Sequence, residues 1–568
     1  MASGAPLLSP PPPRGEVDHA EAAKQRRRIG WGVFSRLGAV AFTPFLVCAA
    51  HAATVSGTIK GPDRTPFRGA FVQAQNAGTK ITTSVLTDRQ GRYRFENLAA
   101  GTYQLRVRAV GYTADPRNSL NLSAQQSVSH EFALKAGKVR WADLSQYQGT
   151  ELFPDVLGNQ VLKGKDVLIG RCFACHGFQS RMASVKHDAN GWIDRVNYMR
   201  GTMHFFLDSA QPFTDQNAED VATYINLLFG ENSILPESPA DIPAYKNLVR
   251  SFSDEAMKIV YVQYEMPNRN RFAWSAVPAR DGTFVVPYYG TANRIARLNP
   301  ATASVEEFRV PHLGTAAIHS AVPAPDGSIW LTQQGSNKLG RWDPQTKKIA
   351  EYQDSYLPGK EGVTAGGAKH TVRVDQQGRV WSTGTPLTVF DPKTGKYTHI
   401  NDVPRVYGLA LDKDGNCWFA ENIQNGQIGK VDAKTLKVTK WSPPTTDGRP
   451  RRIQVVDDGT IWFAEFRAGK IAQFDPKTEK FREYTLPGPD ATPYALGVAR
   501  DGIVWYSSED LDVIGALDPK SGKVTEYPIP FAENTMREFF MDDRGRMWFG
   551  SPANNTVGYF YLATGGRS

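Results

Sequence analysis

One motif recurs seven times along the C-terminal half of the chain: an Asp-Gly or similar turn, followed by a short apolar strand centred on one large residue. Successive copies are 45, 51, 37, 44, 43 and 43 residues apart. The central residues are Val285, Trp330, Trp381, Trp418, Trp462, Trp505 and Trp548. A period of about 40 to 45 residues with four short strands is typical of β-propeller blades, because one blade cannot bury both of its faces alone. The sequence therefore predicts a seven-bladed β-propeller over residues 255–562. The strand-like stretch 259–265 precedes the first copy and is expected to close the ring against the last blade.

Residues 1–52 have the composition of an export signal. A basic cluster around Arg26 is followed by an apolar run over residues 37–50, which ends in the small-residue pattern 50–52. The run is too short to span a bilayer, so a cleaved signal peptide is favoured over an anchor. We expect the mature chain to begin near Ala53, to reach the periplasm unfolded, and to have no membrane span after cleavage.

Charge does not point to nucleic acid. The chain has 66 Lys and Arg against 57 Asp and Glu, a formal net charge of +9. The basic residues are spread through turns rather than gathered into a stripe, as expected for a solvated surface. No nucleic-acid partner is predicted.

Residues 54–135 alternate polar and apolar side chains between frequent turns, which predicts a small β-sandwich. The stretches 55–59, 69–72, 91–95, 101–105 and 111–112 resemble the carboxypeptidase regulatory-like family. The resemblance implies a non-catalytic accessory module. Such a module could bind a cell-wall polymer or a partner, or serve as a folding spacer.

Helical patterning replaces this alternation after a linker at residues 136–162. Over residues 163–235, helices are expected at 191–200 and at 214–229, the second with an apolar face at Val221, Tyr224, Ile225 and Leu228. A helical unit of about seventy residues buries little surface by itself, which suits a domain built around a large apolar cofactor.

Cys172-Phe173-Ala174-Cys175-His176, within this helical unit, matches the attachment signature of c-type haem. Two thiols bind the porphyrin covalently, and the adjacent histidine becomes an iron ligand. A zinc site would need a second pair of ligands at matched spacing, and a thioredoxin-like pair would need a βαβ context. One covalent haem c is therefore predicted on Cys172, Cys175 and His176. Cys417 lies in an apolar strand and is expected to be a core residue.

The second axial ligand is expected downstream of the motif. Candidates are Met182, Met199, Met203, His187 and His204. Residues 186–192, followed by Val196 and Met199, resemble small class I-like cytochrome c domains that place a methionine seven residues after such a tryptophan. That resemblance implies Met199 as the axial ligand, with Met203 second. Thioether ligation fills both axial positions and suits electron transfer.

The propeller repeats resemble streptogramin (virginiamycin B) lyase at residues 461–465, 469–471 and 483–494. In that family two histidines of adjacent blades, a glutamate and Mg²⁺ carry out an elimination, each histidine lying ten or eleven residues before its blade's tryptophan. The matching positions here are Trp274, His319, His370, Tyr407, Arg451, Tyr494 and Arg537. His319 and His370 are thus the candidate catalytic pair, expected to face one another at the ring's axis, with Arg451 or Arg537 available to hold an anionic group.

Two departures put the lyase activity in doubt. The histidines are not in the last two blades, and the family's glutamate position is Pro552; Thr385 stands at that position in the third blade. Glu421, Glu465 and Glu509 are the alternative carboxylates. The axial residues then either line a hydrated channel or form a ligand site.

Three functions follow from these features. The favoured one is a periplasmic c-type cytochrome that transfers electrons to a redox partner in an oxidative, dehydrogenase-linked pathway, its propeller binding a substrate or a partner. The alternative is a streptogramin lyase-like C–O lyase with an appended haem domain, which would use Mg²⁺. A quinohaemoprotein dehydrogenase is disfavoured, because that class resembles an eight-bladed ring with adjacent cysteines.

Overall fold

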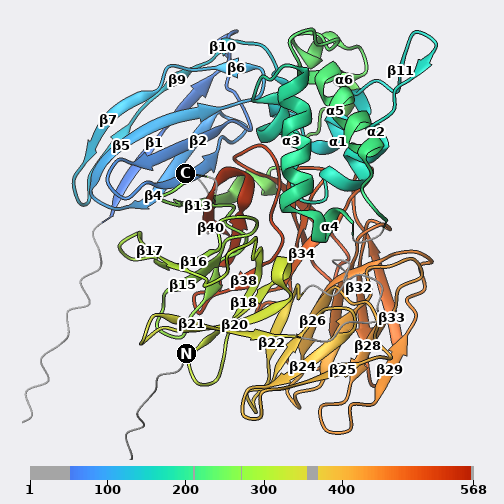
Figure 1. Cartoon of the computed structure of the whole chain (residues 1–568). Helices are drawn as coiled ribbons and strands as arrows, with labels where there is room; N and C mark the ends of the chain where they lie inside the picture. Colours follow the sequence, from blue (N-terminus) through green and yellow to red (C-terminus); the bar gives the residue numbers. More distant parts are fainter. Residues whose placement is uncertain (1–51, 209–210, 270, 355–368, 564–568) are drawn as a thin grey trace, which may run out of the picture. The chain divides into compact units, whose positions relative to one another are not determined.

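The computed structural model describes residues 52–208, 211–269, 271–354 and 369–563 (Figure 1). The predicted signal peptide lies outside this part of the chain, apart from Ala52. Within the described residues, no helix is both long enough and apolar enough to cross a membrane.

The N-terminal domain is the predicted β-sandwich. In one sheet β1 (Ala53–Lys60) pairs with β4 (Arg92–Leu98) in antiparallel fashion and with β8 (Ser127–Ser129) and β9 (Phe132–Ala133) in parallel. The strands of the other sheet run in the order β3 (Ile81–Leu86), β2 (Phe71–Asn76), β5 (Gly101–Arg108) and β7 (Arg117–Leu122). The short strands β6 (Tyr112–Thr113) and β10 (Lys135–Ala136) pair beside them. Alternate side chains of β4 are buried, so the period-two pattern of the sequence marks the core face.

A single sheet runs from this sandwich into the propeller. Strand β13 (Ile259–Glu265) pairs with β3 over residues 260–264, and its other edge pairs with β40 (Thr556–Leu562) along its whole length. The result is an eight-stranded sheet in the order β38-β39-β40-β13-β3-β2-β5-β7. Strand β13 therefore closes the ring as predicted. It also covers an edge of the sandwich sheet that would otherwise be open.

The predicted linker is not an extended connection. It contains η1 (Trp141–Asp143), α1 (Gln146–Leu152) and the hairpin of β11 (Val156–Leu157) and β12 (Gln160–Val161). Trp141 and Leu152 are buried in the same core as the helices that follow. Residues 136–162 thus supply part of the helical core, a role that their short apolar runs do not show in the sequence.

Short helices form the rest of this region and gather in one part of the fold, coloured cyan to green in Figure 1. Asp188 caps α3 at Gly191, and Thr214 and Asn217 form a reciprocal capping box at the start of α5. Both predicted helices are therefore present where the sequence placed them. The elements are α2 (Lys165–Val167), the π-helical turns η2 (Leu168–Cys172) and η3 (Gln179–Ala183), α3 (Ala189–Thr202), α4 (His204–Leu207), α5 (Asp215–Phe229), η4 (Pro239–Asp241), α6 (Tyr245–Leu248) and η5 (Glu255–Lys258).

Over its described residues the propeller consists of seven four-stranded antiparallel blades. The first three contain β14 (Val277–Pro278), β15 (Phe284–Pro287), β16 (Arg294–Asn299) and β17 (Ser304–Arg309); β18 (Ile318–Pro323), β19 (Ile329–Gln333), β20 (Lys338–Asp343) and β21 (Lys348–Gln353); and β22 (Val372–Val374), β23 (Val380–Ser382), β24 (Leu387–Asp391) and β25 (Lys396–Ile400). The next three contain β26 (Gly408–Leu411), β27 (Cys417–Ala420), β28 (Ile428–Val431) and β29 (Val438–Trp441); β30 (Pro450–Val455), β31 (Ile461–Glu465), β32 (Lys470–Asp475) and β33 (Lys480–Thr485); and β34 (Pro493–Val498), β35 (Val504–Ser508), β36 (Val513–Leu517) and β37 (Val524–Pro528). The seventh contains β38 (Phe540–Met541), β39 (Met547–Ser551), β40 and β13.

The recurring tryptophan has a polar partner that explains part of the repeat. In three blades its indole N–H donates to a turn aspartate six residues earlier: Trp381 to Asp375 at 3.1 Å, Trp418 to Asp412 at 3.1 Å and Trp548 to Asp542 at 2.8 Å. The same carboxylates accept backbone N–H groups of the turn. One aspartate thus satisfies both a buried indole and a tight turn, which fixes the spacing between them.

Candidate functional site

The seven residues predicted at the propeller axis form one closed ring of contacts in blade order. Ring centroids are 4.8 Å apart for Trp274 and His319, 3.5 Å for His319 and His370, and 4.3 Å for His370 and Tyr407. The Arg451 guanidinium lies 4.7 Å from the Tyr407 ring and 3.7 Å from that of Tyr494. Arg537 completes the circle, 4.4 Å from Tyr494 and 6.0 Å from Trp274. The structure thus brings His319 and His370 face to face.

The sequence did not decide whether the axial residues line a hydrated channel, and these contacts help to answer that question. Trp274, His319, Tyr494, Arg451 and Arg537 are buried, and His370 and Tyr407 are partly buried. Stacking of π-systems and cation–π contacts fill the centre at this level. The axial residues are therefore a packed layer, in which His370 and Tyr407 keep part of their surface exposed.

Burial and nearby charged groups favour the neutral form of both the His319 and the His370 imidazole. Burial is the main reason that the pKa of His319 lies well below its usual value, and the neighbouring His370 and Arg452 lower it further. Burial likewise lowers the pKa of His370, with Arg452 and Arg451 adding to the effect. The neutral form is therefore favoured for both rings, and the lowered pKa makes each a weak proton acceptor.

Two of the three candidate carboxylates are already engaged. Glu509 forms an ion pair with Arg537, and Glu421 lies 2.7 Å from the Lys440 ammonium. Arg537 is therefore not available to hold an external anion, contrary to the expectation from the sequence. Arg451 is enclosed by the rings of Tyr407, Phe466 and Tyr494. The positions that match the lyase glutamate remain Pro552 and Thr385, as the sequence indicated.

Glu465 is the third carboxylate, and it is 0% exposed on β31. Among the described residues neither of its carboxylate oxygens has a hydrogen-bond partner. Burial raises its pKa to about 8, with the Glu483 carboxylate adding to the rise. Folding therefore favours its protonated form.

A Glu465→Gln variant should gain stability over the parent as pH rises. The folded pKa of Glu465 lies above the unfolded value, so the folded chain holds one more proton between about pH 4.5 and 8. The parent's stability falls across that window, and the amide has no proton to lose. The difference in free energy of unfolding between variant and parent should widen by up to about 1.4 kcal/mol per pH unit.

Urea unfolding from pH 5 to 9 measures this difference. Glu219→Gln, at an exposed position, is the control. A stability difference between Glu465→Gln and the parent that stays constant with pH would contradict a buried ionisable Glu465.

The cysteine motif follows the π-helical turn η2. Cys175 is buried, Cys172 is partly buried, and both are free thiols, as is the buried Cys417 on β27. The His176 Nδ1 atom is 2.8 Å from the Gly177 carbonyl oxygen. A carbonyl only accepts, so Nδ1 carries the hydrogen and the Nε2 lone pair of the neutral ring is left available.

A mostly apolar cavity of about 460 Å³ opens beside these residues. Cys172, Cys175 and His176 line it together with Met182, Met199 and Met203. His187 also lines the cavity, whereas His204 is not among its lining residues and is exposed. The structure thus gathers three of the candidate methionines at one cavity and leaves the choice between Met199 and Met203 as a prediction.

One wall of this cavity comes from the first propeller blade, which the sequence did not indicate. Phe272 and Tyr289 line it, and the Arg181 guanidinium lies 5.7 Å from the Phe272 ring. Tyr289 in turn lies 4.4 Å from Trp274 and 5.5 Å from His319. Aromatic contacts therefore lead from the cavity to the axial ring, through residues more than 95 positions beyond Cys175 in the chain.

Two propeller side chains hold the motif loop in place. The Glu533 carboxylate accepts the backbone N–H of Gly177 at 3.0 Å and that of Ser180 at 2.9 Å. The Arg537 guanidinium donates to the carbonyls of Ala174 and Cys175, each at 3.4 Å. Glu533 lies in a loop without a sequence motif, so only the fold could reveal its role. The described residues contain no group of three or more His, Cys, Asp and Glu side chains able to hold a metal ion.

Comparisons with known proteins cover two of the three regions. Two solved structures resemble the chain: virginiamycin B lyase from Staphylococcus aureus, with 22% identity over 54% of this chain and 100% of that one and a TM-score of 0.47, and a streptogramin B lyase, with 22% identity over 55% and 100% and a TM-score of 0.48. The extracellular domain of a hybrid two-component system from B. thetaiotaomicron has 17% identity over 51% of this chain and 40% of that one, with a TM-score of 0.40. No curated protein matches the chain.

Family models match at both ends of the described chain. Residues 54–135 match the carboxypeptidase regulatory-like domain, and residues 395–565 match the virginiamycin B lyase family. The chain thus carries a carboxypeptidase regulatory-like domain followed by a β-propeller of the virginiamycin B lyase type.

Proposed function

We propose that this protein is an exported c-type cytochrome that transfers electrons in the periplasm, with its propeller as the binding platform for a substrate or a redox partner. The observation that carries the proposal is the cavity of about 460 Å³ at Cys172, Cys175 and His176. Its size falls within the range of roughly 300 to 1,000 Å³ of cofactor sites. Its mostly apolar wall suits a porphyrin.

The residues present fit a covalently bound haem in three respects. The thiols of Cys172 and Cys175 lie at the cavity, where they would form thioether bonds. His176 keeps its Nε2 lone pair available because Nδ1 donates to Gly177. Met199 or Met203, which line the same cavity, would supply a second iron ligand, and Met199 is preferred from the sequence. Once bound, the haem would accept and donate one electron at a time.

The thiols do not resemble those of a disulfide oxidoreductase. Burial raises the pKa of both Cys172 and Cys175 to about 12. Redox-active cysteine pairs work as thiolates with a lowered pKa. This difference supports the covalent haem over the thioredoxin-like alternative.

The second part of the proposal is that the propeller serves as the binding platform. Glu533 and Arg537 hold the motif loop, so a group bound at the cavity would keep a fixed position against blade one. Phe272 and Tyr289 would shield it from water on that side. An electron donor or acceptor would then dock on the propeller, as expected for a protein in a dehydrogenase-linked oxidative pathway.

The proposal is tested on the full chain, exported together with a haem-attachment system. The purified protein should show a haem spectrum, and the oxidised form should show the weak red band of methionine ligation. A Met199→Ala variant should lose that red band and have a lower reduction potential, because thioether ligation raises the potential. Absorption spectroscopy and a redox titration measure both.

Met203→Ala is the matched variant, since Met203 lines the same cavity. It should keep the band. Loss of the band in Met203→Ala with retention in Met199→Ala would assign the ligand to Met203. A purified chain with no haem spectrum at all would refute the proposed function.

A further inference from the structure

A second cavity, of about 670 Å³, lies on one face of the eight-stranded sheet that joins the sandwich to the propeller. Its floor is a set of polar side chains that are cross-strand neighbours. Arg106 on β5 pairs with Gln73 on β2, and Gln104 pairs with Gln75. Gln75 then pairs with Thr82 on β3, and Thr82 with Gln263 on β13.

The two faces of this sheet differ sharply. Val72, Ala74 and Leu105 alternate with the floor residues along the same strands and are buried in the sandwich core. A sheet with one face on a core normally turns its other face to water. Here residues from other parts of the fold stand around that polar face, so its side chains form the floor of a cavity.

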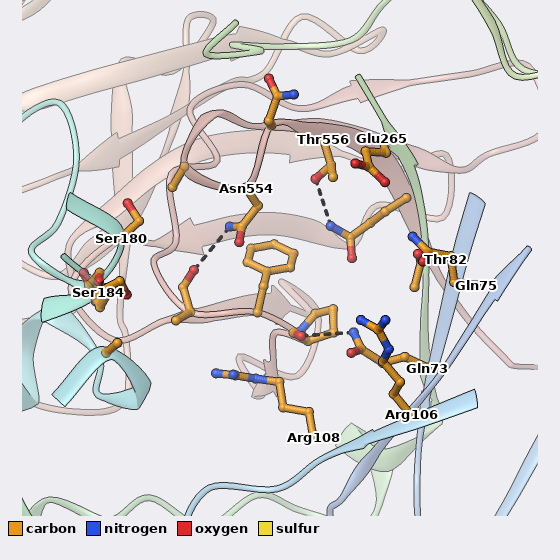
Figure 2. A pocket seen from close by; sticks show the side chains of 18 of the residues that line it. Gln73, Gln75, Thr82, Arg106, Arg108, Ser180, Ser184, Glu265, Asn554 and Thr556 are labelled. Carbon is orange, nitrogen blue, oxygen red and sulfur yellow. Dashed lines mark hydrogen bonds between the residues drawn. The ribbon is translucent and has the colours of Figure 1, made fainter. Parts of the chain in front are cut away.

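Residues of the helical region and of propeller loops form the walls. Ser180, Arg181 and Ser184 come from the turn η3 and its end, and Phe531, Ala532 and Asn554 come from loops of the propeller. Figure 2 shows Arg106, Arg108, Ser180 and Asn554 arranged around a common space. Ser180 and Arg181 line both this cavity and the one at the cysteine motif.

Positive charge dominates the lining. It contains six cationic side chains and two carboxylates, Asp143 and Glu265. Asp143 lies 2.7 Å from Arg140 and 3.4 Å from Arg108, so its single negative charge offsets one of these two cations. Among the described residues Lys80, Arg106 and Arg269 have no ion-pair partner. Like charges lining one hollow make it favourable for an anion.

Amides and hydroxyls account for most of the other lining residues, and the rest are apolar, among them Pro530 and Phe531. The amides are Gln73, Gln75, Gln104, Gln179, Gln263, Asn554 and Asn555. Thr82, Thr556, Ser180 and Ser184 add hydroxyls. The amide N–H groups of Gln73, Gln263 and Asn554 already donate within the wall. A ligand rich in hydroxyl groups would therefore be recognised mainly through the carbonyl oxygens and hydroxyls of the set. An inorganic anion would use the cations and leave this set unused.

We propose that this cavity binds an acidic carbohydrate, a hydroxylated organic anion whose carboxylates contact the arginines on the sheet and whose hydroxyls contact the surrounding amides. Arginine forks recognise carboxylates in bidentate geometry. The volume is in the range of sites for ligands of one to a few sugar units. The proposal goes beyond electron transfer and does not require a haem, because the floor belongs to the sandwich and to β13.

Calorimetry on the purified full chain tests the proposal with digalacturonate as the probe. Binding is expected in low salt and should weaken as salt is added. An Arg106→Gln variant should bind at least about tenfold more weakly, because a charge-assisted hydrogen bond is lost. Arg106 is exposed, so its replacement should leave folding intact.

Arg94→Gln is the matched control. Arg94 is an exposed arginine on β4, in the other sheet of the sandwich, and does not line the cavity. It should bind like the parent. A matched loss in Arg94→Gln would show nonspecific charge attraction and overturn the proposal.

Two further probes test the recognition of charge and the recognition of hydroxyl groups separately. Neutral digalactose should not bind, and phosphate should bind much more weakly than digalacturonate. Equal binding of neutral and acidic disaccharides would refute the charge recognition. Binding of phosphate as strong as that of digalacturonate would refute the hydroxyl recognition. Failure of digalacturonate to bind would refute the site, whether or not the chain carries haem.

Discussion

A Cys172→Ala, Cys175→Ala double variant should carry no covalently bound haem. Each thiol would add across a vinyl group of the porphyrin, so that a carbon–sulfur bond would form and the thiol hydrogen would go to the vinyl carbon, with no net oxidation. Removing both sulfurs removes every covalent bond to the cofactor. The parent chain should keep its haem stain on a denaturing gel, and the double variant should lose it completely. Intact mass measured on the same samples should differ by the mass of one haem plus that of the two sulfur atoms removed by the substitutions.

Cys417→Ala provides the control for this loss. Cys417 is a buried free thiol on β27, away from the cavity that Cys172 and Cys175 line. Its removal should leave the stain unchanged. If the double variant still stained, the motif would not be the attachment site, and the proposed function would lose its basis.

An Arg537→Met variant should lower the free energy of unfolding by about 3 to 5 kcal/mol, the usual cost of leaving one partner of a buried ion pair uncompensated. Arg537 is 0% exposed, and its partner Glu509 is buried as well. The guanidinium also contacts the rings of Tyr494 and Trp274 and donates to the motif loop. Methionine fills much of the volume but supplies neither charge nor donors. Urea unfolding followed by tryptophan fluorescence measures the loss.

Two companion variants identify the cause. Glu509→Gln in the Arg537→Met background should recover part of the lost stability, because the stranded carboxylate is removed. Arg309→Met, at an exposed position on β17, should change stability by less than about 0.5 kcal/mol. If the Glu509→Gln substitution deepened the loss in place of relieving it, the charge would not be the main contribution of Arg537.

The propeller illustrates how far the sequence determines the fold. The seven recurring residues all lie on the second strand of their blades, and 259–265 is the strand that completes the seventh. Such local signals are reliable because each blade repeats the same turn, buried strand and aromatic contact. The linker 136–162 shows the limit: Trp141 and Leu152 enter the helical core through contacts with residues distant in the chain.

For the candidate sites, too, the sequence predicted some features and gave no sign of others. Residue spacing placed His319 and His370 in adjacent blades, and in the structure their ring centroids lie 3.5 Å apart. Spacing did not show that Arg537 is bound to Glu509, nor that Glu533 accepts two N–H groups of the motif loop. Glu533 and Gly177 are 356 positions apart, and no local pattern encodes a contact over that separation.

By itself, the sequence determined the blade number, the sandwich and the cysteine motif, because period, alternation and residue spacing are properties of short segments. Tertiary structure alone decided that β13 joins β3 to β40, that the axial residues pack into a closed layer, and that blade one forms a wall of the cavity at Cys175. The same holds for the polar cavity over the continuous sheet. Each of these depends on which surfaces meet once the domains have formed, and side chains acquire their neighbours, burial and charge compensation only at that point.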